Sequence, residues 1–194
     1  ETVSLMQDAD SLRRIAREFV ADMASDGVIY AETRWAPQQH LAGGLTAVAA
    51  TEAVQAGLVE GMESASRSGT TIIVRQILCL MRHLDVPEDV VDLAVNHAPG
   101  DVGVDIAGPE DGFPLAPFTN ALTRIQAAGI HLTVHAGEAV GPESILDALD
   151  HGAERLGHGV RIIEDHNESE WGPTAQRVLS NQVPLEVCPT SNTQ

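Results

Sequence analysis

Lysine is absent from this 194-residue sequence, and all eleven of its strongly basic side chains are arginine. The absence excludes Schiff-base chemistry on a lysine, the lysine of a phosphate-binding loop, and a metal pair bridged by a modified lysine. Basic charge is scarce overall, because 28 Asp and Glu residues leave a net charge of −17. A field of this sign repels phosphate backbones, so nucleic acid is not expected as a partner.

Cysteine and long apolar runs are also scarce. Cys79 and Cys188 lie far apart and form no C-x-x-C pair, which excludes a cysteine-rich zinc site, and we expect both to be small core residues. No signal peptide and no apolar run long enough to span a bilayer is found, so we expect a cytoplasmic protein without a membrane partner. The length is that of one domain, and the first residue, Glu1 rather than Met, indicates an internal fragment.

Apolar patterns predict strands and helices in strict alternation. The expected strands are 28–35, 71–80, 101–108, 131–136, 155–160 and 184–188, and the expected helices are 4–24, 45–66, 88–96, 118–128, 143–150 and 173–180. Such alternation with short connections predicts a parallel α/β domain. Because a complete eight-stranded β/α barrel needs about 250 residues, six strands fit either a doubly wound sheet or a barrel with pieces missing.

The stretch from His131 to Glu138 carries the first sign of chemistry. It is predicted to be a buried strand that ends in a small-residue turn, with His135 and Glu138 at its carboxyl end. A neutral imidazole is a common metal ligand, and a carboxylate beside a metal can act as an acid or a base. The alternative, which stays open on this stretch alone, is a buried histidine bonded to backbone and a glutamate that caps the helix beginning near Pro142.

Functional-looking residues lie at the carboxyl ends of several predicted strands. They are Gly108, His135, Glu138, His158 and the Ser191-Asn192 pair. A barrel gathers all such ends at one mouth, whereas an open sheet gathers only those beside its switch point. The distribution therefore favours a barrel.

Three stretches, residues 133–138, 155–160 and 187–192, together resemble the adenosine deaminase family in its bacterial branch. They read TVHAGE, RLGHGV and VCPTSN, in the order and spacing of that family. Residues 30–37, 105–108, 141–144 and 159–165 match it as well. The resemblance covers essentially the whole chain.

The resemblance implies a zinc-dependent hydrolytic deaminase on a TIM (β/α)8 barrel. Residues 1–194 would be a single incomplete barrel domain with about six of the eight β/α units, from the second strand to the seventh. The implied reaction converts adenosine and deoxyadenosine to inosine and ammonia in purine nucleoside salvage. A small purine nucleoside would be the binding partner, with one Zn²⁺ per complete chain, and the oligomeric state is not predicted.

The resemblance also assigns roles to four residues. His135 would be a zinc ligand, Glu138 would protonate the ring nitrogen beside the attacked carbon, and His158 would orient or deprotonate the attacking water. The backbone N–H of Gly108 would hold the purine. The family's His-x-His pair and its paired Asp residues are absent from this sequence. With one metal ligand where at least three are needed, the chain is expected to be inactive on its own.

The motifs also bear on four other functions. Adenine deaminase, which acts on the free base, and a non-catalytic purine-binding relative stay open, although the presence of both Glu138 and His158 argues against the second. A cytidine-type zinc deaminase needs H-x-E with P-C-x-x-C, whereas the spacing at His135 is H-x-x-E and the cysteine pair is absent. A serine hydrolase is disfavoured because no G-x-S-x-G occurs.

Overall fold

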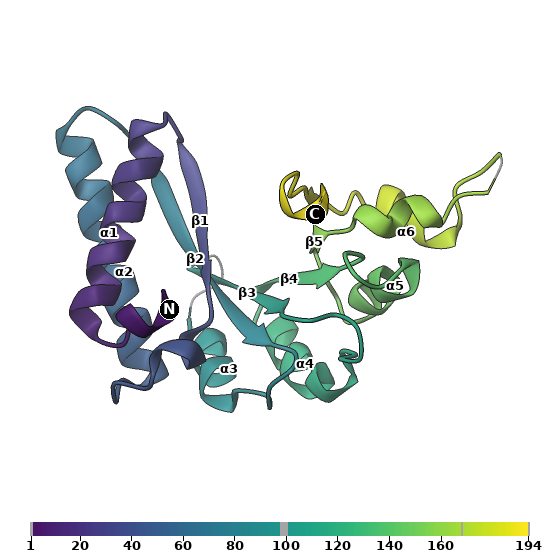
Figure 1. The fold of residues 1–194 in the computed structure, drawn as a ribbon, viewed down its shortest axis with the longest axis horizontal. Helices are drawn as coiled ribbons and strands as arrows, with labels where there is room; N and C mark the ends of the chain where they lie inside the picture. Colours follow the sequence, from purple (N-terminus) through teal and green to yellow (C-terminus); the bar gives the residue numbers. More distant parts are fainter. Residues whose placement is uncertain (1, 98–100, 168, 194) are drawn as a thin grey trace. The chain divides into compact units, whose positions relative to one another are not determined.

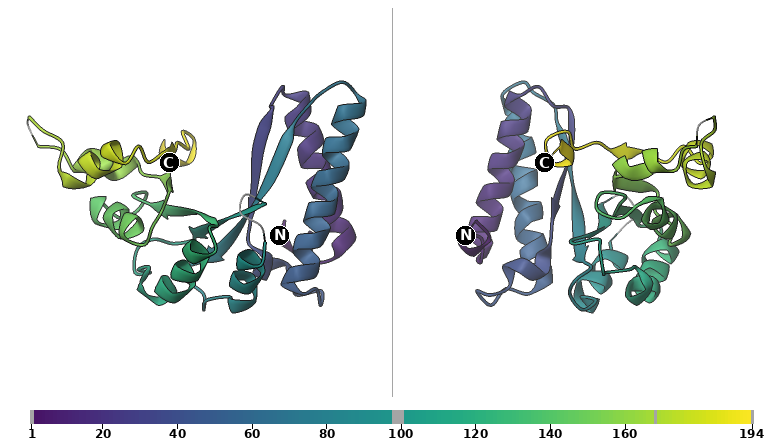
Figure 2. Two further views of the ribbon diagram at one scale, coloured as in Figure 1. Left: turned by 180° about the vertical axis from the view of Figure 1, so that it is seen from behind. Right: turned by 45° about the vertical axis from the view of Figure 1, so that its right-hand side comes forward.

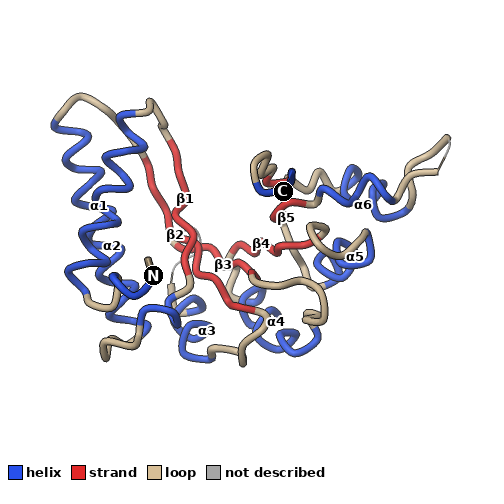
Figure 3. Tube along the Cα trace, in the orientation of Figure 1, coloured by secondary structure: helices blue, strands red, loops and turns tan. Residues whose placement is uncertain are grey.

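A computed structural model describes residues 2–97, 101–167 and 169–193. The chain divides into two compact units, residues 1–79 with 89–103 and residues 80–88 with 104–194. Strands and helices alternate along the whole chain, as predicted (Figures 1 and 3). The strands are β1 (Tyr30–Trp35), β2 (Ile73–Met81), β3 (Val102–Ala107), β4 (His131–Ala136), β5 (Arg155–His158) and β6 (Leu185–Glu186). The α-helices are α1 (Ala9–Ser25), α2 (Ala47–Arg67), α3 (Glu88–Val95), α4 (Thr119–Ala127), α5 (Pro142–Asp150) and α6 (Pro173–Ser180).

The strands follow one another in the sheet in their order along the chain, β1-β2-β3-β4-β5-β6. β1 pairs with β2, β4 with β5, and β5 with β6, each in parallel. In a doubly wound sheet, the order of the strands reverses at a switch point. Parallel strands that follow one another in chain order, joined by helical crossovers, are instead typical of a β/α barrel. The chain thus supplies six β/α units of the TIM-barrel fold, and the predicted fold class is confirmed.

In the first unit, helices α1 and α2 lie side by side against β1 and β2, as both views of Figure 2 show. Two glycines of α2 allow the close approach, because a Cβ at Gly57 would lie 2.2 Å from the carbonyl oxygen of Arg13 and one at Gly61 would lie 2.6 Å from Cβ of Val20.

The predicted helix 4–24 begins later than expected. The side chain of Asp8 accepts the N–H of Ser11 at 2.8 Å and starts α1 there, after a short 3₁₀ turn.

In the second unit, α4 and α5 pack on β4, and the fully buried apolar side chains of this unit include Ile125, Leu132, Val134, Ile145 and Leu156. The predicted strand 155–160 ends at His158, where the backbone turns left-handed, and the predicted strand 184–188 is only Leu185–Glu186.

The two cysteines lie in different surroundings, and neither forms a disulfide. Cys79 of β2 is buried, as predicted, and Cys188 is half-buried. None of the helices in the described ranges has the length and apolar character needed to cross a bilayer.

Candidate active site

His135, near the end of β4, is fixed by a buried carboxylate of β3. Its Nδ1 lies 3.0 Å from the carboxyl group of Asp105, whose side chain is fully buried. Where the carboxylate of Asp105 accepts this hydrogen bond, Nδ1 carries the hydrogen and Nε2 of the ring is able to bind a metal ion. Gly157 pairs with His135 across the sheet, and a Cβ there would lie 2.9 Å from Nδ1. Glycine at 157 therefore makes room for the imidazole ring.

His158 ends β5 with a backbone conformation unusual for a side-chain-bearing residue, since its φ is 66°. Its Nδ1 is 2.9 Å from the side-chain nitrogen of Asn192. The N–H of Cys188 donates to the side-chain oxygen of Asn192 at 3.2 Å, and this bond assigns which end of the amide faces the histidine. Nδ1 of His158 therefore accepts, and the neutral ring carries its hydrogen on Nε2.

The structure brings three of the four predicted site residues together. Nε2 of His158 lies 3.4 Å from Oε2 of Glu138, and the rings of His135 and His158 meet edge to face with centroids 5.2 Å apart. The side chain of His158 is 9% exposed, whereas that of Glu138 is 43% exposed. The group thus consists of one buried imidazole, one half-buried imidazole and one carboxylate open to a ligand.

The fourth predicted residue, Gly108, follows β3 and adopts φ 98°, which favours glycine. A Cβ at this position would lie 2.8 Å from Nδ1 of His83. The side chain nearest to this face of Gly108 is therefore His83 and not one of the other three predicted site residues.

The turn that carries Glu138 is bonded to a residue that the sequence alone did not single out. The buried carboxylate of Glu110 accepts the backbone N–H groups of Gly137, Glu138, Ala139 and Val140 at 2.6, 3.1, 2.7 and 3.0 Å. Glu110 is 27 to 30 residues away from these partners. The only signal in the sequence was its place just beyond a strand end.

Burial and hydrogen bonding act on Glu110 in opposite directions. Burial by itself raises the pKa of this carboxyl. Hydrogen bonds from the side chain of Ser144 and from the backbone of the turn outweigh burial and hold the pKa below its ordinary value. Glu110 is therefore ionised at neutral pH.

A metal ion would find one fitting ligand here. The Asp105–His135 pair is the carboxylate–histidine arrangement typical of metal sites. Across the described ranges, however, no three His, Cys, Asp or Glu side chains are grouped so as to hold a metal. Because a zinc site needs at least three protein ligands, His135 fits zinc as one member of a larger set.

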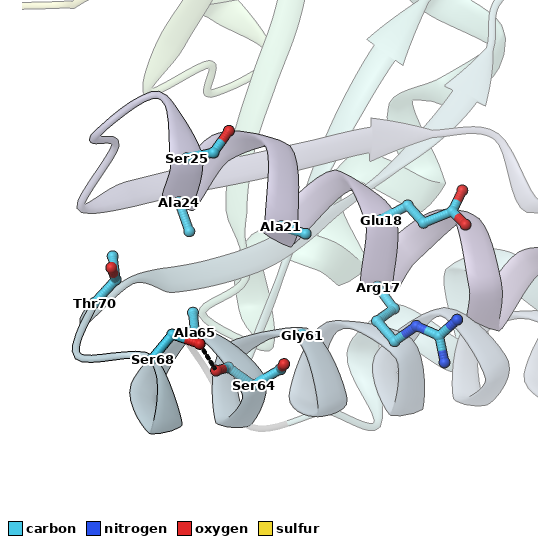
Figure 4. Close-up of a pocket in the computed structure, with 10 residues that line it drawn as sticks. All are labelled: Arg17, Glu18, Ala21, Ala24, Ser25, Gly61, Ser64, Ala65, Ser68 and Thr70. Carbon is cyan, nitrogen blue, oxygen red and sulfur yellow. Dashed lines mark hydrogen bonds between the residues drawn. The ribbon is translucent and has the colours of Figure 1, made fainter.

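Several hollows of the described residues lie outside this group. In the second unit, a cavity of about 250 Å³ borders Glu110 and is lined in part by Arg82, Asp111, Glu143 and Asp147. In the first unit, a hollow between α1 and α2 is lined by small and polar side chains (Figure 4). The residues of the second hollow include none of the predicted site residues.

The sequence matches the family model described as adenosine deaminase over residues 1–194. The chain belongs to the adenosine deaminase family. It is 43% identical over 200 residues to an adenosine deaminase of Mycolicibacterium gilvum, a match that covers 100% of this chain and 55% of that protein. The chain thus spans about half the length of this curated relative.

Two solved structures share the fold. An amidohydrolase from Burkholderia ambifaria with bound Zn superposes with a TM-score of 0.77 and 29% identity over 96% of this chain and 50% of that one. An adenine deaminase from Arthrobacter aurescens gives a TM-score of 0.77 and 28% identity over 96% of this chain and 55% of that one.

Proposed function

We propose that this chain supplies the proton-donating part of the active site of a hydrolytic adenosine deaminase. The full-length protein would convert adenosine and deoxyadenosine to inosine and ammonia, and residues 1–194 would form part of one β/α-barrel domain. The proposal is supported above all by one observation. The carboxylate of Glu138 lies 3.4 Å from Nε2 of His158, beside a histidine that Asp105 holds in the ligand tautomer.

Each of the four residues has a distinct task in this proposal. Glu138, in its protonated carboxylic acid form, donates its proton to the purine nitrogen next to the attacked carbon and becomes a carboxylate, which makes addition to the ring easier. His158 carries its hydrogen on Nε2 in this arrangement, so it orients its partners as a donor rather than acting first as a base. The backbone N–H of Gly108 binds the purine. His135 contributes Nε2 to a zinc ion, which would activate water for attack when bound.

The free-base reaction is a second candidate, favoured by the likeness to the Arthrobacter aurescens adenine deaminase. Assays of the full-length protein with adenosine, deoxyadenosine and adenine, each followed by ultraviolet absorbance, separate the two. Turnover of adenine alone would replace the proposed substrate and leave the chemistry of the site unchanged.

The proposed proton donor is tested by Glu138→Gln in the full-length protein. The variant should keep its zinc and lose about 10²- to 10⁴-fold in kcat, because general acid catalysis typically contributes that much. Glu154→Gln is the matched control, since Glu154 is an exposed carboxylate paired with His131 on the surface of the same unit. Near-normal turnover of Glu138→Gln would contradict the assignment.

A further inference from the structure

We propose that Glu110 is a positioning residue that holds the turn of residues 137–140, and with it Glu138, in place for proton transfer. This inference rests on the proposed function of Glu138. It concerns a residue that does not itself touch the substrate, because the carboxylate of Glu110 is occupied by the backbone of the turn.

The turn presents four consecutive N–H groups to one carboxylate. Oε1 of Glu110 accepts from Gly137, and Oε2 accepts from Glu138, Ala139 and Val140. Consecutive N–H groups that point the same way form an anion-binding concavity. Here the anion is the Glu110 side chain of the same polypeptide, so the four N–H groups of the turn already have an acceptor.

The carbonyl groups of the same turn are bonded to the segment that follows His158. The N–H of Arg161 donates to the carbonyl oxygen of Gly137 at 2.9 Å, and the guanidinium of Arg161 donates to that of Ala139. Glu110 and Arg161 therefore hold the turn through its donors and its acceptors respectively. The backbone of Glu138 lies between Gly137 and Ala139, which are both held by these hydrogen bonds. The position from which the Glu138 side chain extends is therefore fixed.

A carboxylate suits this position better than an amide would. Four donors need an acceptor with two oxygens and no hydrogen of its own, which describes an ionised glutamate. A glutamine has one oxygen, and its NH₂ group would face N–H donors. Arg82, whose guanidinium is buried nearby, attracts Glu110 electrostatically and favours its ionised form.

The consequence for catalysis is geometric. A displacement of about 1 Å at a reacting group can cost on the order of 10²-fold in rate. Removing the carboxylate should therefore lower kcat by roughly 10- to 100-fold, while KM and zinc content change little. The matched control is Asp111→Asn, because Asp111 is the neighbouring exposed acid, whereas the four N–H groups of the turn donate to Glu110.

The test uses Glu110→Gln in the full-length protein, with kcat, KM and bound zinc measured for both variants. The double variant with Glu138→Gln should be no slower than Glu138→Gln alone, since both changes act through the same proton donor. Amide hydrogen exchange should accelerate at residues 137–140 in Glu110→Gln and stay unchanged in Asp111→Asn. If Glu110→Gln does not fold, Glu110→Asp, which keeps the charge on a shorter side chain, is measured in the same way.

The outcomes separate this inference from the function on which it rests. A lower melting temperature with unchanged kcat, or losses that add to those of Glu138→Gln, would overturn the positioning role. If the intact full-length protein deaminates no purine, the proposed function fails. The hydrogen-exchange measurement then still decides whether Glu110 holds the turn. Unchanged protection of residues 137–140 in Glu110→Gln would show that it does not.

Discussion

At the scale of single residues, the lowered pKa of Glu110 links the folded state to pH. The carboxyl is ionised more easily when folded, so its contribution to the free energy of unfolding is complete above its ordinary pKa of 4.5 and is lost as the pH falls through the lower, folded value. Urea unfolding of the full-length protein should thus show a difference between wild type and Glu110→Gln that shrinks as the solution is acidified. A difference that grew on acidification would contradict the direction of the shift.

The two histidines of the site should differ in their effect on metal content. His135→Ala removes the nitrogen that Asp105 leaves available as a ligand, so the full-length variant should lose zinc. His158→Ala should keep zinc and slow the chemical step, because Nδ1 of His158 is bonded to Asn192 and its Nε2 faces Glu138. Metal analysis of both purified variants checks this. An equal loss of zinc would make His158 a ligand.

The sequence predicts the group of His135, Glu138 and His158 because each lies at or just beyond the end of a strand. The partners that orient them were not predicted as such. Asp105 is 30 residues from His135, and Asn192 is 34 residues from His158. Such bonds depend on strand register and on the path of loops, and neither is encoded in a local pattern.

At the scale of secondary structure elements, the contact of α1 with α2 requires a residue without a side chain. A Cβ at Gly61 would lie 2.6 Å from Cβ of Val20, far inside a normal contact. Gly61→Ala should therefore destabilise the full-length protein by about 1–3 kcal/mol, as overpacking typically does, despite the better helix propensity of alanine. Urea or thermal unfolding measures the change.

Ser64→Ala is the control for this helix, since Ser64 is exposed one turn further along α2. The Ser64→Ala variant also gains helix propensity, but it only removes a hydroxyl group and adds no atom that could meet a neighbouring side chain. Its free energy of unfolding should therefore equal that of the wild type or be slightly higher. A stabilised Gly61→Ala variant would show that the two helices can separate at little cost.

In the described part of the chain, the type and order of the six strands and six α-helices follow from the apolar periodicity. The ends of the elements do not, because they depend on single bonds and backbone angles. Asp8 starts α1 later than the apolar stripe does, and the left-handed backbone of His158 ends β5 early. The second case lies at the site itself, where local strain is commonly found.

At the scale of the whole molecule, the 194-residue chain expressed alone should be prone to aggregation and should not deaminate adenosine. Apolar side chains next to the outermost strands of the described sheet are exposed, with Ile29 before β1 at 77% and Val187 after β6 at 69%. Exposed sheet edges with apolar residues invite pairing with other chains. Folding stability is normally only about 5–15 kcal/mol, so six strands of an eight-stranded barrel leave little margin.

Within the described residues of the same chain no three His, Cys, Asp or Glu side chains are grouped to hold a metal, and His135 is the proposed zinc ligand, so zinc should bind weakly at best. Size-exclusion chromatography, bound zinc and the adenosine-to-inosine absorbance change test the two expectations together, with the full-length protein as the positive control. A soluble monomer with stoichiometric zinc and measurable turnover would contradict both. It would mean that six β/α units suffice for a folded core, and that the metal ligands are other residues of this chain than the one assigned here.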